Sequence, residues 1–322
     1  MAHQIRHKRY YRRGPKKGSF YWAGRRTNGK IKKAVQEKAK SKNKEIVKNT
    51  QNNVERRYPL NIFLDHKIGL RTILGAFKLI AGSTGTGKSN TMAVLIEEYF
   101  RYNMPMHLID IEGEHLSFAK EFNRVKLLDY DKYQNMKNFK SVLTTVVNGR
   151  YSLIIDMSSF PEDDKAVFLK NYLDTLWEIE SINKVPLALI IEEAHILVPQ
   201  GKNTTIKNRL VDFAKRGRKR KVEVTFVTQR VQDIDKQVIT QAETSFLHKV
   251  THPTDLAVYK ALIPSKQIYQ KVLSLGRGQV VFVHGDNVFI GQVRKRKTEH
   301  GAQTIHVGEL KPPLKKLMSR HI

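Results

Sequence analysis

The sequence of 322 residues contains no cysteine, and this absence excludes disulfide bonds and cysteine-ligated zinc sites. It also lacks any apolar run of about 18 residues, the length that a membrane-spanning helix needs. The N-terminus is polar and shows no signal peptide. We therefore expect a cytoplasmic protein without membrane insertion. Acidic residues are scarce, since 30 Asp and Glu stand against 58 Lys and Arg, and the net charge is +28.

The positive charge is concentrated at the N-terminus. Residues 1–58 carry nineteen Lys or Arg and three Glu, so this segment holds +16 of the total. Aromatic residues interrupt the cations: Tyr10, Tyr11, Phe20, Tyr21 and Trp22. Cations neutralise phosphates and aromatic rings stack on bases, so the segment is predicted to be a disordered, nucleic-acid-binding arm. A solubilising or targeting tail, or a segment attracted to anionic lipid, is the alternative.

One motif indicates a phosphate-binding loop. Residues 82–89 fill G-x-x-x-x-G-K-[ST], after an apolar strand pattern and before an amphipathic helix pattern at 91–100. The residues are Gly82, Ser83, Thr84, Gly85, Thr86, Gly87, Lys88 and Ser89. The glycines let backbone amides converge on the phosphates of ATP, Lys88 adds a positive charge, and the Ser89 hydroxyl can bind Mg²⁺. The alternative is a glycine-rich turn without a ligand.

Apolar strand patterns alternate with helical patterns along the rest of the chain. Five strands are predicted, at 78–81, 106–110, 153–156, 187–191 and 222–227, and helices at 165–181 and 205–215. The helix at 165–181 should bury Val167, Leu169, Tyr172, Leu173 and Leu176. This order predicts an α/β fold with a mainly parallel sheet. We expect the arm at 1–58, an ATPase domain at 59–310 and a basic tail at 311–322.

Two of the predicted strands end in acidic residues. Asp156 stands alone after one strand, whereas Glu192 and Glu193 follow another as a pair. The pair suits an ATPase better, because one carboxylate can support Mg²⁺ through water while the other polarises the attacking water. We therefore predict Glu192 as the metal-side residue and Glu193 as the general base. His195 either senses the γ-phosphate or contributes to packing.

Four segments together resemble the HerA–FtsK superfamily of ring-shaped DNA-pumping ATPases, and its HerA branch most. They are Asp110-Ile111-Glu112-Gly113-Glu114-His115, Ile190-Ile191-Glu192-Glu193-Ala194-His195, Gly217-Arg218-Lys219 and Thr228-Gln229-Arg230. The first segment usually reads Asp-Pro-His-Gly-Glu-Tyr in that family. Asp110, Gly113 and Glu114 match it, and the other three positions depart.

The resemblance implies a RecA-like P-loop domain in a ring, expected to be a hexamer, that hydrolyses ATP to move along double-stranded DNA. Arg218 would reach the γ-phosphate of the neighbouring subunit, with Arg216 as the alternative, and Gln229 would sense that phosphate. The basic run around Arg218 could instead face DNA. Pore loops would lie within 131–148 or 199–207.

The resemblance leaves the biological role open. About 76 residues precede the P-loop strand, too few and too polar for the β-barrel of HerA helicases. This favours DNA packaging, or transfer of a mobile element, with a nuclease or a capsid or portal component as a further partner. The alternatives are a repair-helicase motor working with a nuclease, an ATP-switched DNA-binding protein, and a nucleoprotein whose P-loop is only structural.

Deleting residues 1–58 should weaken DNA binding and leave a folded, ATP-hydrolysing body. Each phosphate that the arm no longer neutralises should reduce the slope of log affinity against log salt by about 0.9. Affinity for a DNA duplex is measured between roughly 50 and 200 mM salt, where such ionic contacts weaken strongly. An unchanged slope would assign the arm to another partner.

Overall fold

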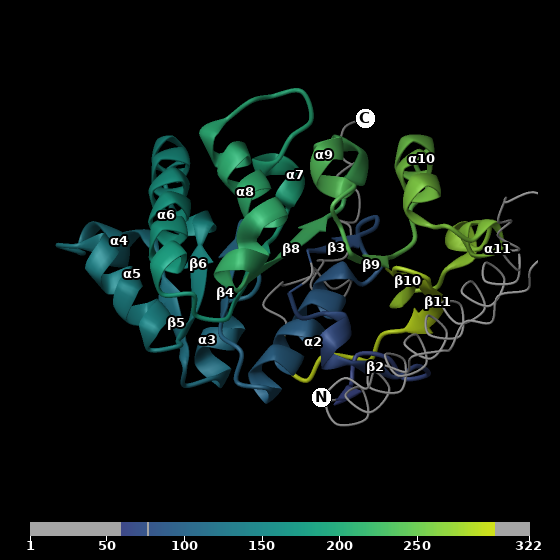
Figure 1. The fold of residues 1–322 in the computed structure, drawn as a ribbon, viewed down its shortest axis with the longest axis horizontal. Coiled ribbons are helices and arrows are strands. Elements are labelled where there is room, and N and C mark those ends of the chain that lie inside the picture. Colours follow the sequence, from purple (N-terminus) through teal and green to yellow (C-terminus); the bar gives the residue numbers. More distant parts are fainter. Residues whose placement is uncertain (1–58, 76, 300–322) are drawn as a thin grey trace, which may run out of the picture. The chain divides into compact units, whose positions relative to one another are not determined.

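The structure, a computed structural model, describes residues 59–75 and 77–299, so the predicted arm and basic tail lie outside the described residues. A nine-stranded sheet runs through this part of the chain in the order β11-β10-β9-β3-β8-β7-β4-β6-β5 (Figure 1). The strands are β3 (Lys78–Ala81), β4 (Met106–Asp110), β5 (Val125–Leu128), β6 (Ser152–Asp156), β7 (Leu187–Ile191), β8 (Val222–Thr228), β9 (Thr244–Leu247), β10 (Gln279–His284) and β11 (Asn287–Gln292). Within this sheet, only the two pairings of β10 are antiparallel, so the predicted mainly parallel α/β sheet is confirmed.

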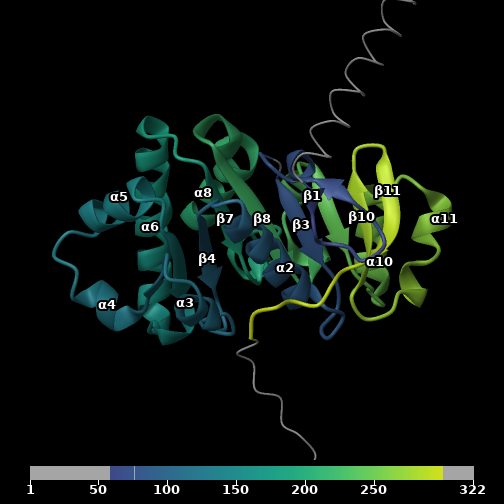
Figure 2. The same cartoon turned by 90° about the horizontal axis from the view of Figure 1, so that it is seen from below.

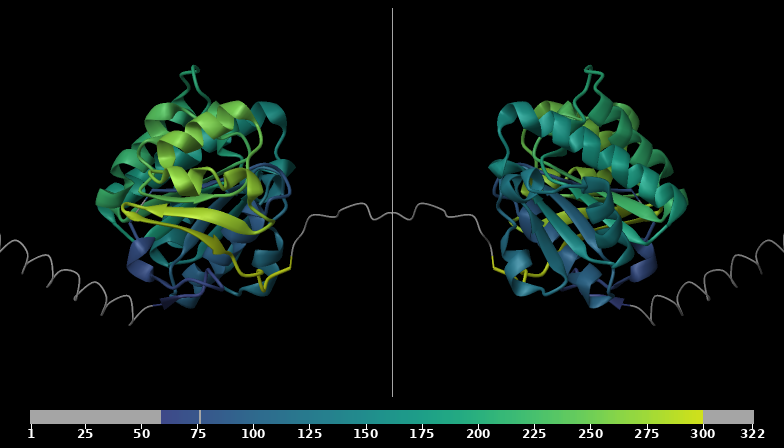
Figure 3. Two further views of the ribbon diagram at one scale, coloured as in Figure 1. Left: turned by 90° about the vertical axis from the view of Figure 1, so that its right-hand side faces the viewer. Right: turned by 90° about the vertical axis from the view of Figure 1, so that its left-hand side faces the viewer.

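The five predicted strands are present, and four further strands of the sheet were missed. Two of these, β5 and β9, have four residues each, and β5 contains the polar Lys126 while β9 contains Thr244 and Ser245, which interrupt an apolar pattern. The other two, β10 and β11, form a hairpin at one edge of the sheet, seen in yellow in Figure 3. Its two-residue turn contains Gly285 with φ of 55°, a left-handed conformation that glycine adopts readily. A separate two-stranded sheet precedes β3, in which β1 (Pro59–Leu60) pairs antiparallel with β2 (Ile68–Gly69).

Helices cover both faces of the sheet (Figures 1 and 2). They are α2 (Lys88–Arg101), α3 (Ser117–Glu121), α4 (Tyr130–Gln134), α5 (Phe139–Asn148), α6 (Glu162–Ile182), α7 (Ala194–Leu197), α8 (Thr205–Arg216), α9 (Lys236–Ile239), α10 (Pro253–Leu262) and α11 (Lys266–Tyr269). In Figure 1, α2 and α3 lie below the sheet, and α6, α8, α9 and α10 lie above it. Among the described helices, none combines the length and the apolar character that crossing a bilayer requires.

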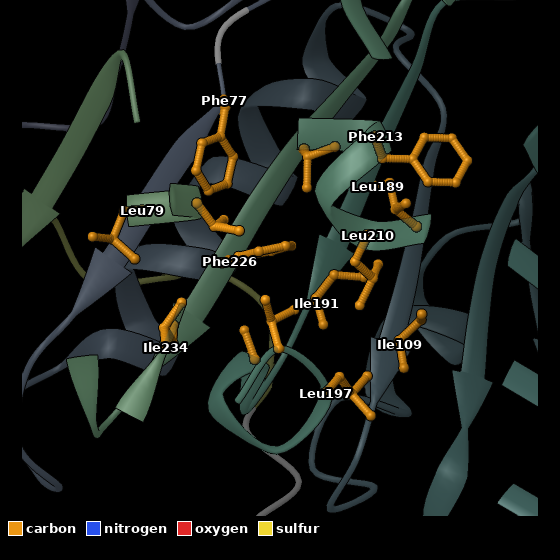
Figure 4. Packing of buried hydrophobic residues seen from close by; sticks show 14 of the residues in the cluster. Phe77, Leu79, Ile109, Leu189, Ile191, Leu197, Leu210, Phe213, Phe226 and Ile234 are labelled. Atoms are coloured by element: carbon orange, nitrogen blue, oxygen red, sulfur yellow. The ribbon is translucent and has the colours of Figure 1, made fainter. Parts of the chain in front are cut away.

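The two faces of the sheet form two apolar clusters, because successive strand residues point in opposite directions. In β3, Leu79 packs in the cluster under α6 and α8, and Ile80 packs against α2. Figure 4 shows the first cluster, with Leu79, Leu189, Leu210 and Phe213 among its labelled residues.

The prediction that Val167 belongs to the buried face of α6 is wrong. Val167 is 66% exposed, while its neighbour Phe168 is buried. Positions two apart on a helix lie about 200° apart around its axis, so Val167 is nearly opposite Leu169.

A buried ion pair holds the start of β3 to β8. Lys78 Nζ lies 3.0 Å from Glu223 Oε1 and donates to Ile73 O at 2.6 Å. The other oxygen, Glu223 Oε2, accepts from Gly75 N at 2.8 Å. Both charged side chains are almost fully buried. The pair therefore fixes the turn that leads into the P-loop strand.

Replacing Glu223 by Gln should strongly destabilise the protein. The change keeps the shape of the side chain but leaves the buried Lys78 without its counter-charge, a loss that costs about 3–5 kcal/mol in comparable pairs. Glu178→Gln, which breaks the exposed pair with Lys140, is the control and should cost at most about 1 kcal/mol. Urea unfolding measures both. Equal costs would contradict the importance of the buried pair, and Lys78→Met added to Glu223→Gln should recover part of the stability.

Candidate nucleotide-binding site

The loop of residues 82–89 connects β3 to α2 in the conformation that a phosphate-binding loop needs. Gly82, Gly85 and Gly87 all have positive φ, and Gly87 precedes the first residue of α2. A Cβ atom on Gly87 would lie 3.2 Å from the backbone of Gly278, a tight contact, so packing favours glycine there as well. The amides at the start of α2 make this end of the helix favourable for an anion.

The parallel sheet brings the predicted site residues to the same edge. Lys88 at the start of α2, Glu192 and Glu193 after β7, and Gln229 after β8 all follow the carboxyl ends of neighbouring strands. Burial lowers the pKa of Lys88, and the nearby carboxylates of Glu193 and Glu192 act against this shift. Gln229 contacts the loop itself, because Thr84 Oγ1 donates to Gln229 Oε1 at 2.5 Å.

Glu193 is held in an unusual backbone conformation. Its φ of 44° and ψ of 46° place it in the left-handed region, which a residue other than glycine rarely adopts. Its Oε2 atom lies 3.1 Å from His195 Nδ1, which in turn lies 3.3 Å from Thr228 Oγ1. His195 therefore connects Glu193 to the end of β8, next to Gln229.

Glu192 belongs to a buried polar cluster. Its Oε1 lies 2.8 Å from His115 Nε2, and Asp110 accepts hydrogen bonds from the backbone amides of Gly113, Glu114 and His115. Burial raises the pKa of both Asp110 and Glu192. Asp110, His115 and Glu192 offer possible ligand atoms within 4.8 Å of one another. The structure thus gives the two adjacent glutamates different surroundings.

The chemistry of two predicted ligands fits Mg²⁺. Glu192 Oε2 is buried and has no hydrogen-bond donor among the described residues. Ser89 is the second residue of α2 and is partly exposed. Carboxylate and hydroxyl oxygens, with water, are the ligands that this hard cation prefers.

Asp156, the rival acidic residue, has a local structural role. Its Oδ1 accepts hydrogen bonds from Ser158 N at 3.0 Å and from the Ser158 hydroxyl at 2.5 Å. The side chain thereby caps the short 3-10 helix Met157–Ser159 that follows β6. This supports the choice of the Glu192–Glu193 pair.

Arg218 lies at the opposite edge of the sheet. It belongs to the 3-10 helix Gly217–Arg220 that precedes β8, and a Cβ atom on Gly75 would lie 3.7 Å from its Nε. The 7 residues of β8 separate it from Gln229, a span of about 20 Å. Its side chain is 74% exposed, with Glu243 at 3.8 Å. The structure therefore does not bring Arg218 to the P-loop of its own chain. Arg216, also exposed, ends α8 near Asp212.

Comparisons with known proteins agree with these motifs. The family profile described as "Helicase HerA, central domain" matches residues 66–181. The DNA double-strand break repair helicase HerA of Sulfurisphaera tokodaii is 27% identical over 171 residues, which cover 49% of this chain and 34% of that protein. HerA of Pyrococcus furiosus is 27% identical over 166 residues, covering 50% and 30%. Over these residues the chain is similar to P-loop ATPases of the HerA–FtsK superfamily. It spans about a third of the length of these relatives.

Two solved structures share the fold of this chain. VirB4 of Thermoanaerobacter pseudethanolicus has a TM-score of 0.57 and 13% identity, over 74% of this chain and 97% of that one. B204, the DNA-packaging ATPase of Sulfolobus turreted icosahedral virus, has a TM-score of 0.51 and 15% identity, over 68% and 98%. These likenesses agree with the RecA-like topology of β3, β8, β7 and β4.

Three residues of the site have no predicted role. His115 departs from the HerA pattern, yet it contacts Glu192. His248 and Gly278 contact the P-loop although they follow it by more than 150 residues. No local pattern marks His248. Gly278 stands in a glycine-rich stretch at 276–278 that could have suggested a close backbone approach.

Proposed function

We propose that this chain binds ATP with Mg²⁺, hydrolyses it, and uses the cycle to move along double-stranded DNA. The observation that carries the proposal is the meeting of Lys88, Glu192, Glu193 and Gln229 at one edge of the sheet. The names of the related proteins, repair helicases and a DNA-packaging ATPase, support the choice of DNA as the substrate.

Each residue has a distinct part in the proposed reaction. The loop amides and Lys88 bind the β- and γ-phosphates. Bound Mg²⁺, supported by Ser89 and Glu192, would supply charge neutralisation on those phosphates. Glu193 accepts a proton from the attacking water, and His195 orients its carboxylate through the 3.1 Å contact. Gln229, which contacts the loop through Thr84, would respond to the γ-phosphate.

A neighbouring subunit would complete the site. Because Arg218 is remote from its own P-loop and exposed, its guanidinium is free to reach a nucleotide bound by another copy. It lines a pocket of about 410 Å³ with Arg150 and Lys221, which adds positive charge to the same edge. If each subunit contacts the next in this head-to-tail way, the assembly can close into a ring, and we propose a ring of six subunits.

The exposed loop between α7 and α8 is our candidate for contact with DNA. Its tip, 200–203, is exposed, while its base is held by Lys207, whose Nζ donates to Pro199 O at 3.0 Å and Lys202 O at 2.8 Å. The loop projects above the helices in Figure 3. The other candidate, 131–148, is mostly helical, in α4 and α5.

We propose DNA packaging or mobile-element transfer as the process, with a capsid component or a nuclease as partner. The similarity to HerA favours repair with a nuclease as the alternative.

Lys88→Ala should abolish nucleotide binding, whereas Glu193→Gln should bind ATP and hydrolyse it slowly. Loss of the general base is expected to lower turnover by about 100-fold or more. Nucleotide affinity and phosphate release, with and without duplex DNA, measure these effects. Asp156→Asn is the matched control and should retain activity, because that carboxylate caps a 3-10 helix. Near-normal turnover in Glu193→Gln would move the role of base to another acid.

Arg218→Ala should retain ATP binding and assembly but lose hydrolysis by a factor on the order of 10³. Mixing Arg218→Ala subunits with Glu193→Gln subunits should restore part of the activity, because some interfaces then combine an intact base with an intact arginine. Mixing Glu193→Gln with the double variant offers no such interface and should remain inactive. If the first mixture stays inactive while native mass spectrometry shows subunit exchange, Arg218 does not act in trans. Arg216→Ala, treated in the same way, tests the alternative.

A further inference from the structure

His248, directly after β9, is bonded to the P-loop on one side of its ring and to α2 on the other. Nδ1 lies 3.1 Å from Thr86 O, and Nε2 lies 2.9 Å from Thr91 Oγ1 in the first turn of α2. A carbonyl oxygen only accepts hydrogen bonds, so Nδ1 must carry the proton. Nε2 then accepts from the Thr91 hydroxyl. The imidazole is fully buried, and it joins the loop to the helix that follows.

The carbonyl of Thr86 receives two donors from outside the loop. Besides His248 Nδ1, Gly278 N donates to it at 2.9 Å. A phosphate-binding loop works when its N–H groups face the anion and its carbonyl oxygens face away. Both donors come from segments far along the chain, so the tertiary fold occupies this carbonyl with hydrogen bonds.

The backbone around His248 also determines where the loop begins. His248 N donates to Ala81 O at 2.8 Å, and Ser83 N donates to Lys249 O at 2.9 Å. A Cβ atom on Gly82 would lie 2.4 Å from His248 Cβ, so only glycine allows this close approach. The entry to the loop and its centre are thus both braced by one short segment after β9.

We propose that His248 is a positioning residue for nucleotide binding, which shapes the P-loop for phosphate before the nucleotide arrives. The proposal rests on the proposed function, since it concerns the same ATP site. It assigns His248 no contact with the reacting atoms.

The charge state of the ring agrees with this role. Burial, together with the nearby Lys88 cation, lowers the pKa of His248 to about 3, although the hydrogen bond to Thr86 acts in the opposite direction. The neutral imidazole keeps one donor and one acceptor, and its two partners require both. A second positive charge beside Lys88 would also disturb the phosphate site.

The experiment compares two buried histidines. His248→Gln removes the two-sided brace. His107→Gln is the matched control, because His107 is also fully buried and its pKa is also lowered to about 3, but its ring lies on β4 and bonds to Tyr172 OH rather than to the loop. Thr91→Val is a milder second variant that removes one of the two hydrogen bonds and changes the helix little. Each is assayed for affinity to a fluorescent ATP analogue and to ADP, for KM and kcat, and for urea stability.

Loss of two neutral hydrogen bonds in His248→Gln should lower the affinity for the ATP analogue and for ADP by about tenfold or more. KM for ATP should rise while kcat at saturation stays unchanged, because the general base and the trans arginine are intact. Thr91→Val should show a smaller change in the same direction, and His107→Gln should bind like the wild type even if it is less stable.

Two results would overturn the inference. In one, His248→Gln and Thr91→Val bind nucleotide as the wild type does. In the other, His107→Gln loses as much affinity as His248→Gln, which would reduce the effect to general destabilisation. Failure of the proposed function looks different, since the wild type and His107→Gln would then bind no nucleotide at all.

Discussion

The pairing of β3 with β8 on one side and β9 on the other is the constraint on which the site depends. Ala81, the last residue of β3, is in register with Thr228 of β8 and Leu247 of β9. The next residues along the three strands, Gly82, Gln229 and His248, must therefore emerge level at one edge of the sheet. The P-loop therefore begins between two side chains that contact it. Gln229 accepts a hydrogen bond from Thr84, and the imidazole of His248 bonds to the carbonyl of Thr86.

The same strand direction separates the two ends of β8. Gln229 follows its carboxyl end, while Arg218 precedes its amino end, beside the turn that the buried Lys78–Glu223 pair fixes. Under the proposed function, β8 would connect Gln229, near the γ-phosphate bound by its own subunit, to Arg218, which would act on the γ-phosphate bound by a neighbouring subunit.

The adjacent glutamates that follow β7 show how one strand end can place identical side chains in different surroundings. Glu192 enters a buried cluster with His115 and Asp110, whereas Glu193, in a left-handed conformation, stays partly exposed and contacts His195. A buried, fixed carboxylate suits a supporting position near a metal, and an accessible one suits proton transfer.

Much of the fold and of the candidate site could be predicted from the sequence, because its information there is local. The motif at 82–89, the apolar strands with acidic ends and the helical periodicity of α6 and α8 each depend on residues close in the chain. The short strands β5 and β9, the bracing of the loop by His248 and Gly278, and the contact between His115 and Glu192 depend on segments joined only by the sheet. The sequence by itself determined which chemical groups are present and which strands carry them. Only the tertiary structure decided which of those groups share an edge, because strand order and register bring together residues that no local pattern connects.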